Sequence, residues 1–126
     1  MDELLSEFLT ETMESLSTLD VELVRLERNP DDPELLQNIF RLVHTIKGTC
    51  GFLGLPRLEK VAHAAENVLG RVRDRELEVT PTIVTLILES LDRIKEILAE
   101  LERSQSEPAG NDAGLIERLN IAADGG

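Results

Sequence analysis

The stretch PELLQNIFRLVHTIKGTCGF, residues 33–52, carries the pattern that decides the fold. It opens on Pro33, a residue favoured in the first turn of a helix, and Asp32 precedes it as a candidate N-cap. Apolar residues then recur every three or four positions, which predicts an amphipathic helix with one buried face. The predicted buried stripe consists of Leu35, Ile39, Leu42, Ile46 and Leu53.

The same pattern repeats along most of the chain. Amphipathic runs predict helices over about residues 2–28, 33–52, 56–75 and 81–103, and the last two again open on prolines. Short connections make consecutive long helices antiparallel neighbours, so the predicted fold class is all-α: an antiparallel up-down-up-down four-helix bundle. The bundle takes residues 1–103, a linker residues 104–112, a short fifth C-terminal helix residues 113–123 and a tail residues 124–126.

The composition narrows the class of protein. The 126 residues include 13 Lys and Arg against 25 Asp and Glu, and the formal charge of −12 argues against binding to nucleic acid or an anionic membrane. Aromatic residues make up only 2 %, which favours an aliphatic helical core over sheets. Neither a signal peptide nor an apolar run near the ~20 residues of a membrane span is expected. The single cysteine, Cys50, has no partner for an internal disulfide, which fits a reducing, cytoplasmic compartment.

His44 lies opposite the apolar stripe of its helix, where each residue turns by about 100°, and is therefore predicted to face solvent. Gly48 and Gly51 follow within two turns, although glycine costs a helix roughly 0.5–1 kcal/mol relative to alanine. One interpretation is that the helix frays there. The other is that bare backbone lets another protein or a phosphoryl group approach His44, with the ammonium of Lys47 stabilising a developing anion.

A second polar cluster follows on the next predicted helix. His63 and Glu66 are three residues apart and share a face, and an antiparallel arrangement brings Glu66 within reach of His44. A carboxylate that accepts one imidazole N–H fixes the tautomer and leaves the other nitrogen unprotonated and nucleophilic. The alternatives are an ordinary surface pair or a bond from Glu66 to Arg73 or to another basic neighbour. A metal site at the two histidines and Glu66 is disfavoured, since Lys47 would repel a cation and too few ligands are present.

These residues resemble a known family. The stretch HTIKG at residues 44–48, followed by GFLG at residues 51–54, resembles the H-x-x-K-G motif of histidine phosphotransfer (HPt) domains. Residues 61–69, VAHAAENVL, resemble the third helix of the N-terminal phosphotransfer domain of CheA-type chemotaxis histidine kinases. The resemblance covers roughly residues 1–105.

The resemblance implies a role for each site residue. His44 corresponds to the phosphorylated histidine, Glu66 to the carboxylate that orients it and sets its tautomer, and His63 to a supporting histidine. Lys47 is assigned to charge stabilisation and Gly48 to steric clearance. Candidate partner contacts are Phe40, Arg41, Gly51 and Phe52. For the two phenylalanines the alternative is partial burial in the bundle.

The implied function is histidine phosphotransfer in two-component chemotaxis signalling. His44 takes a phosphoryl group from ATP held by the kinase domain of a chemotaxis histidine kinase, in cis or in trans. It passes the group to an aspartate on the receiver domain of a CheY-like or CheB-like response regulator. The chain alone is then not an enzyme and binds no cofactor or metal, because ATP and Mg²⁺ belong to the kinase domain and Mg²⁺ to the regulator. It is expected to be a monomer, and either a fragment of a larger kinase or the substrate of a kinase acting in trans.

Two other function classes compete with phosphotransfer. A non-catalytic helical docking bundle fits the acidic surface and the heptad-like first and fourth helices, and it predicts that His44→Gln leaves partner function intact. A metalloprotein in the bundle core requires inward-facing Glu-x-x-His pairs, but the chain offers only the reverse order, from His63 to Glu66.

Overall fold

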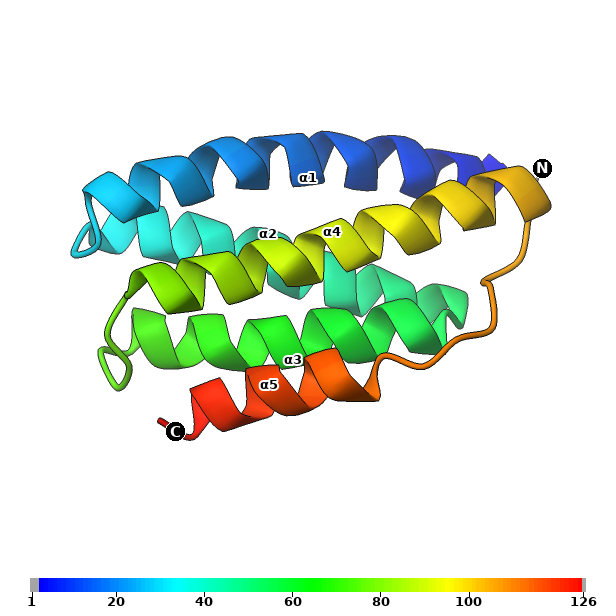
Figure 1. The fold of residues 1–126 in the computed structure, drawn as a ribbon. Coiled ribbons are helices and arrows are strands. Elements are labelled where there is room, and N and C mark those ends of the chain that lie inside the picture. Colours follow the sequence, from blue (N-terminus) through cyan, green and yellow to red (C-terminus); the bar gives the residue numbers. More distant parts are fainter. Residues whose placement is uncertain (1–2, 126) are drawn as a thin grey trace.

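A computed structural model describes residues 3–125, and these form five α-helices and no strands (Figure 1). The helices are α1 (Glu3–Arg28), α2 (Pro33–Leu53), α3 (Pro56–Arg73), α4 (Pro81–Ser104) and α5 (Ala113–Ala123). The first four run alternately up and down, α4 packs against α1, and α5 lies along α3. The predicted fold class is therefore confirmed. Residue 2 of the first predicted helix and residue 126 of the predicted tail lie outside the described residues.

Local sequence explains where the helices begin and end. α2, α3 and α4 each begin at a proline, and the side chains of Asp32 and Thr80 cap α2 and α4 by accepting backbone N–H groups of the first turn. α2 continues through Gly48 and Gly51 and ends at Gly54, whose φ of 70° supplies a left-handed cap. The interpretation that the helix frays at Gly48 and Gly51 is therefore wrong.

The four long helices enclose an aliphatic core. On α2 the predicted stripe is only partly correct, since Leu42 and Leu53 are half-buried. Leu36, Val43 and Cys50 complete the buried face instead, because α2 packs between α1 and α3 and has to cover both neighbours. None of the helices within residues 3–125 is long and apolar enough to cross a membrane.

A polar network holds α5 and the segment before it against α3 and α4. α3 begins after Leu55, which offers no side-chain cap, and the Glu107 carboxylate accepts two of its free backbone N–H groups at 3.0 and 2.9 Å. The buried Asp112 accepts a hydrogen bond from Nε of Arg57 on α3 at 2.8 Å and another from Arg93 on α4. The buried apolar residues of α5 are Leu115, Leu119 and Ala123.

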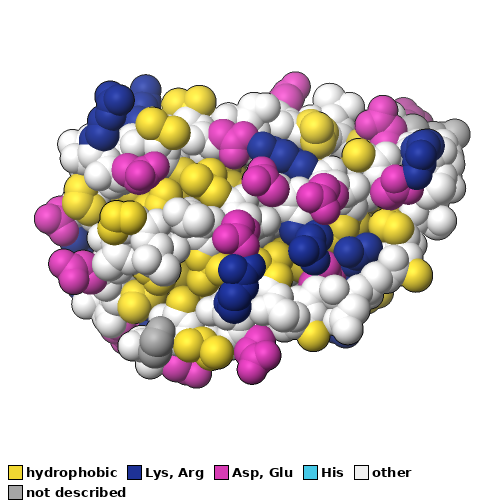
Figure 2. Space-filling model, in the orientation of Figure 1, with side chains coloured by type: hydrophobic (Ala, Val, Ile, Leu, Met, Phe, Trp, Pro, Cys, Tyr) yellow, Lys and Arg dark blue, Asp and Glu magenta, His cyan; other side chains and the backbone are white. Residues whose placement is uncertain are grey.

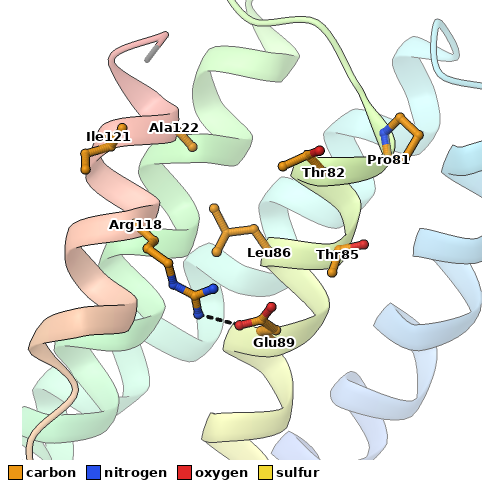
Figure 3. Close-up of a pocket in the computed structure, with 8 residues that line it drawn as sticks. All are labelled: Pro81, Thr82, Thr85, Leu86, Glu89, Arg118, Ile121 and Ala122. Atoms are coloured by element: carbon orange, nitrogen blue, oxygen red, sulfur yellow. Dashed lines mark hydrogen bonds and ion pairs between the residues drawn. The ribbon is translucent and has the colours of Figure 1, made fainter.

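An apolar groove of about 470 Å³ runs between α4 and α5. Figure 2 shows apolar side chains gathered on this face of the molecule. Leu86 of α4 and Ile121 and Ala122 of α5 line the groove, and Arg118 pairs with Glu89 across it (Figure 3). This ion pair is a second polar link between α4 and α5.

Candidate functional site

His44 is exposed on the outer face of α2, as predicted, with 57 % of its side chain accessible. Its Nδ1 atom hydrogen-bonds to Oε2 of Glu66 on α3. The two helices pack closely and are joined by only residues 54 and 55, which places their side chains side by side. The structure thus brings together the histidine and the carboxylate that the sequence pairs.

Glu66 is largely buried, with 11 % of its side chain accessible, and both of its oxygens are occupied. Lys47 donates from Nζ to Oε1 at 3.0 Å, while His44 is bonded to the other oxygen. Burial by itself raises the pKa of Glu66, but the hydrogen bonds from Lys47 and His44 outweigh it and hold the pKa below its ordinary value. Glu66 is therefore an anion at neutral pH.

The anionic Glu66 determines the tautomer of His44. An ionised carboxylate only accepts hydrogen bonds, so Nδ1 of the imidazole has to carry the shared proton. In the neutral ring the lone pair then belongs to Nε2, which has no hydrogen-bond partner among residues 3–125. In that neutral form the site presents an unprotonated nitrogen on an exposed side chain, which is the form of the nucleophile that attacks.

Phe40 and Arg73 complete the surroundings of His44 in a way that sequence reasoning missed. The half-buried Phe40 ring is stacked on the imidazole, with centroids 5.9 Å apart and planes inclined by 14°. The guanidinium carbon of Arg73 on α3 lies 4.0 Å from the Phe40 centroid. Arg73 bonds to Asp74 and not to Glu66, so the alternative pair of Glu66 with Arg73 is wrong. The alternative bond to another basic neighbour is present, to Lys47, beside the bond to His44. The spacing of four residues between Phe40 and His44 is the signal that points to this stack.

The remaining predicted residues of α2 are exposed along the same helix as His44. A Cβ at Gly48 would meet no other part of the described chain within 4 Å, whereas one at Gly51 would lie 2.3 Å from the flexible end of Glu59. Phe52 is 79 % exposed, so partial burial is wrong for this residue, and Arg41 is exposed as well. This stretch of the helix is therefore accessible to a second protein.

Two other sequence-derived candidates stay outside the cluster. His63 is exposed on α3 and makes no hydrogen bond or ion pair within residues 3–125. The described part of the chain holds no group of three or more His, Cys, Asp or Glu side chains able to bind a metal ion. Cys50 is buried, and burial, with the charges of Glu107 and Glu59, raises the pKa of its thiol to about 12. It is therefore a neutral core residue.

Comparison with known sequences connects this geometry with one family. The sequence profile of the Hpt domain matches residues 3–107. The chain is 39 % identical over 117 residues to the sensor histidine kinase CheAY of Helicobacter pylori, which covers 93 % of the chain. It is 34 % identical over 101 residues, 80 % of the chain, to the chemotaxis protein CheA of Bacillus subtilis. The chain spans only 15 % of the length of each of these two relatives.

Solved structures show the same architecture. The phosphorylated P1 domain of CheA3 in complex with CheY6 from R. sphaeroides superposes with a TM-score of 0.88 at 28 % identity, covering 98 % of both chains. The CheA phosphotransferase domain from Thermotoga maritima superposes with a TM-score of 0.76 at 33 % identity, covering 80 % of this chain and 98 % of that one.

Proposed function

This chain belongs to the Hpt domain family, among the CheA-type chemotaxis kinases, and from that premise we propose that His44 carries a phosphoryl group from a kinase domain to a response regulator. The observation that carries the proposal is the pairing of Nδ1 with a buried, ionised Glu66, while Nε2 of the exposed His44 side chain has no partner in the described part of the chain. The chain acts as the substrate and carrier, without an ATP site of its own. ATP and Mg²⁺ bind to the kinase domain, in cis or in trans.

In the first step, the Nε2 lone pair of His44 attacks the γ-phosphorus of ATP. A bond forms between Nε2 and phosphorus, and the bond to the leaving oxygen of ADP breaks. The ring keeps its proton on Nδ1 and gains positive charge, which the anionic Glu66 stabilises. In-line phosphoryl transfer depends mainly on positioning and on charge, and these are what the cluster supplies.

The neighbours of His44 support the incoming group. The Lys47 ammonium is 26 % accessible and holds Glu66 in its ionised form, and we assign it to charge stabilisation near the phosphoryl group. The open space over Gly48 gives steric clearance, and His63 has a supporting role on the adjoining helix. Arg41, Gly51 and Phe52 offer the accessible surface for a partner.

In the second step, the phosphoryl group passes from Nε2 to an aspartate of a receiver domain. The solved complex of a phosphorylated P1 domain with CheY6 supports this direction of transfer. The acceptor is a CheY-like or CheB-like regulator that brings its own Mg²⁺. Both steps take place in the cytoplasm, with this domain as a monomer.

The test is phosphoryl incorporation from labelled ATP and a chemotaxis kinase core, in wild type, His44→Gln and His63→Gln. The chain contains two histidines, so His63→Gln shows which of the two carries the label, whatever its supporting role does to the rate. We expect an acid-labile, base-stable label that His44→Gln abolishes, that His63→Gln retains, and that a response regulator removes. A wild-type chain that stays unlabelled, beside a kinase core that phosphorylates its own known substrate, would overturn the proposal and favour a docking bundle.

A further inference from the structure

The hydrogen bond to Glu66 leaves one motion of the His44 imidazole poorly controlled. An N–H···O bond prefers an angle above about 150° and weakens steeply only below about 120°, so the ring plane can rock about the Cβ–Cγ bond by tens of degrees without losing the bond. The Phe40 ring restricts this motion on one side, because its plane is only 14° from parallel to the imidazole and the two centroids are 5.9 Å apart. Glu66 and Phe40 together define both the direction and the plane of the ring.

The plane of the ring matters for the chemistry. The lone pair of Nε2 lies in the imidazole plane, so a tilted ring directs it away from the phosphorus atom. Phosphoryl transfer in line requires the attacking atom, phosphorus and leaving oxygen to be aligned, and small displacements cost large factors in rate. A residue that fixes the plane therefore acts on the rate of transfer without touching the phosphoryl group.

Phe40 is itself held in place by α3. A Cβ added at Gly70 would make an ordinary van der Waals contact of 3.5 Å with Cε2 of Phe40, so the ring lies beside α3 at that glycine. The Arg73 guanidinium lies over the Phe40 ring and is oriented by Asp74, whose Oδ1 accepts from Nε at 3.0 Å. The stack thus runs from α3 to the reactive ring on α2.

We infer that Phe40 and Arg73 are positioning residues for phosphoryl transfer: Phe40 fixes the plane of the His44 imidazole, and Arg73 fixes Phe40. This role rests on the proposed function. It differs from the prediction that Phe40 contacts a partner, because a positioning residue changes the rate of the bound complex and a contact residue changes its affinity.

The experiment measures kcat and KM for phosphorylation of the chain by the kinase core. The variants are Phe40→Leu and Arg73→Ala, with Phe40→Tyr and Arg73→Lys as conservative rescues. Arg71→Ala is the matched control, since it removes the same charge from the same helix, where Arg71 pairs with Glu76 instead. NMR of the His44 ring protons, assigned with His63→Gln, reports the stack without any kinase. Melting temperatures show which variants fold.

We expect Phe40→Leu to lower kcat about 10-fold and Arg73→Ala a few-fold, with KM unchanged. Phe40→Tyr, Arg73→Lys and Arg71→Ala should stay near wild type. The His44 ring protons should move downfield in Phe40→Leu and not in Phe40→Tyr, because only an aromatic ring shields them.

Two results would overturn the inference and are distinguishable. If wild type is labelled normally and Phe40→Leu, while folded, keeps its kcat or changes only KM, the positioning role fails and the proposed function stands. If wild type takes no label, the proposed function fails, and the positioning role fails with it even where NMR shows the stack.

Discussion

Glu66 and Asp112 are two buried carboxylates with similar surroundings and different partners. Their side chains are only 11 % and 3 % accessible, and each accepts hydrogen bonds from two basic groups. The pKa of each carboxyl is held below its ordinary value. For Asp112 the hydrogen bond from Arg57 is the main cause, opposed by burial and reinforced by Arg93. Both carboxylates are therefore anions in the folded protein at neutral pH.

The partners separate the two clusters. Asp112 is bonded to two arginines from α3 and α4, and a guanidinium keeps its charge and has no lone pair. That cluster joins α3 and α4 to the segment before α5 and offers no nucleophilic nitrogen. Glu66 is bonded to Lys47 and to the exposed His44, whose second nitrogen has no partner within residues 3–125. Where the Asp112 cluster has a second arginine, the Glu66 cluster has a histidine. The same kind of ion-pair cluster then holds a reactive side chain in place.

The largest expected effect is on the rate of phosphorylation in Glu66→Gln. The substitution keeps the shape of the side chain and removes the charge that orients His44 and stabilises its cationic form, so we expect a loss of about 10²-fold. The melting temperature should fall by less than in Asp112→Asn, because only Lys47 is part-buried, whereas His44, with 57 % of its side chain accessible, stays solvated without its partner. Labelled-ATP assays and thermal unfolding of the same samples check both statements. An unchanged rate would remove Glu66 from the mechanism.

Asp112→Asn is the matched variant at the other cluster, and the opposite outcome is expected. Two arginines, at 19 % and 33 % side-chain accessibility, lose their shared anion. Removing one member of a fully buried ion pair costs about 3–5 kcal/mol. Because the two arginines are partly exposed, we expect Asp112→Asn to cost about 2–3 kcal/mol of unfolding free energy, which lowers the melting temperature by roughly 10 °C. Phosphorylation below the melting temperature should match wild type. A slow but fully stable Asp112→Asn would abolish the distinction between the clusters.

The cluster around Glu66 could be predicted from the sequence, because its members lie on consecutive helices joined by a short loop. Helical periodicity places His44 outside, and the antiparallel connection brings Glu66 to it. Local pattern also indicated every helix, since prolines and caps mark most of the starts.

The cluster around Asp112 could not be predicted in the same way. Residues 104–112 have the composition of a linker, and the hydrogen bonds of Glu107 and Asp112 to α3 cross about 50 residues of chain. Contacts between residues so far apart along the chain produce no periodic sequence pattern from which they could be predicted. The one available signal is Leu55, which precedes α3 and supplies no cap, so the free N–H groups of that helix need an acceptor from elsewhere.

Lowering the pH tests whether the negative charge of Asp112 is what stabilises its cluster. A carboxyl whose pKa is lowered by folding stabilises the protein at pH values above the pKa that it has in the unfolded chain. This stabilisation is lost as the pH falls through the lower pKa that it has in the folded protein. The difference in unfolding free energy between wild type and Asp112→Asn should be full at pH 7 and shrink towards zero on acidification. Urea unfolding at a series of pH values measures it. A difference that persists in strong acid would show that packing, and not charge, accounts for the stability that Asp112 contributes.

Glu107→Ala tests another contact between the segment before α5 and α3, and we expect a smaller effect on stability. Its carboxylate caps the first turn of α3, and the loss of a cap typically costs about 1 kcal/mol. We expect faster hydrogen exchange at the amides of Arg57 and Leu58, a slightly lower melting temperature and a normal rate of phosphorylation. Unchanged exchange at these amides would mean that water replaces the cap without cost.

The smallest expected effect comes from a glycine beside each cluster. Gly48 of α2 and Gly114 of α5 both lie in helices, and a Cβ at either would meet no other part of the described chain within 4 Å. Alanine at Gly48 should therefore raise the free energy of unfolding by about 0.5–1 kcal/mol, and alanine at Gly114, close to a helix end, by at most that amount.

The two glycines should differ in function, because only Gly48 lies where a kinase or a regulator has to approach His44. Gly114→Ala should leave phosphorylation unchanged, whereas Gly48→Ala should slow it a few-fold and Gly48→Leu much more, although both remain folded. Substitution at Gly48 would then raise the free energy of unfolding and lower the rate of phosphorylation. Substitution at Gly114 would change only the free energy of unfolding. A Gly48→Leu variant that is phosphorylated normally would show that the missing side chain has no functional reason, and it would reduce the contrast between the clusters to the histidine alone.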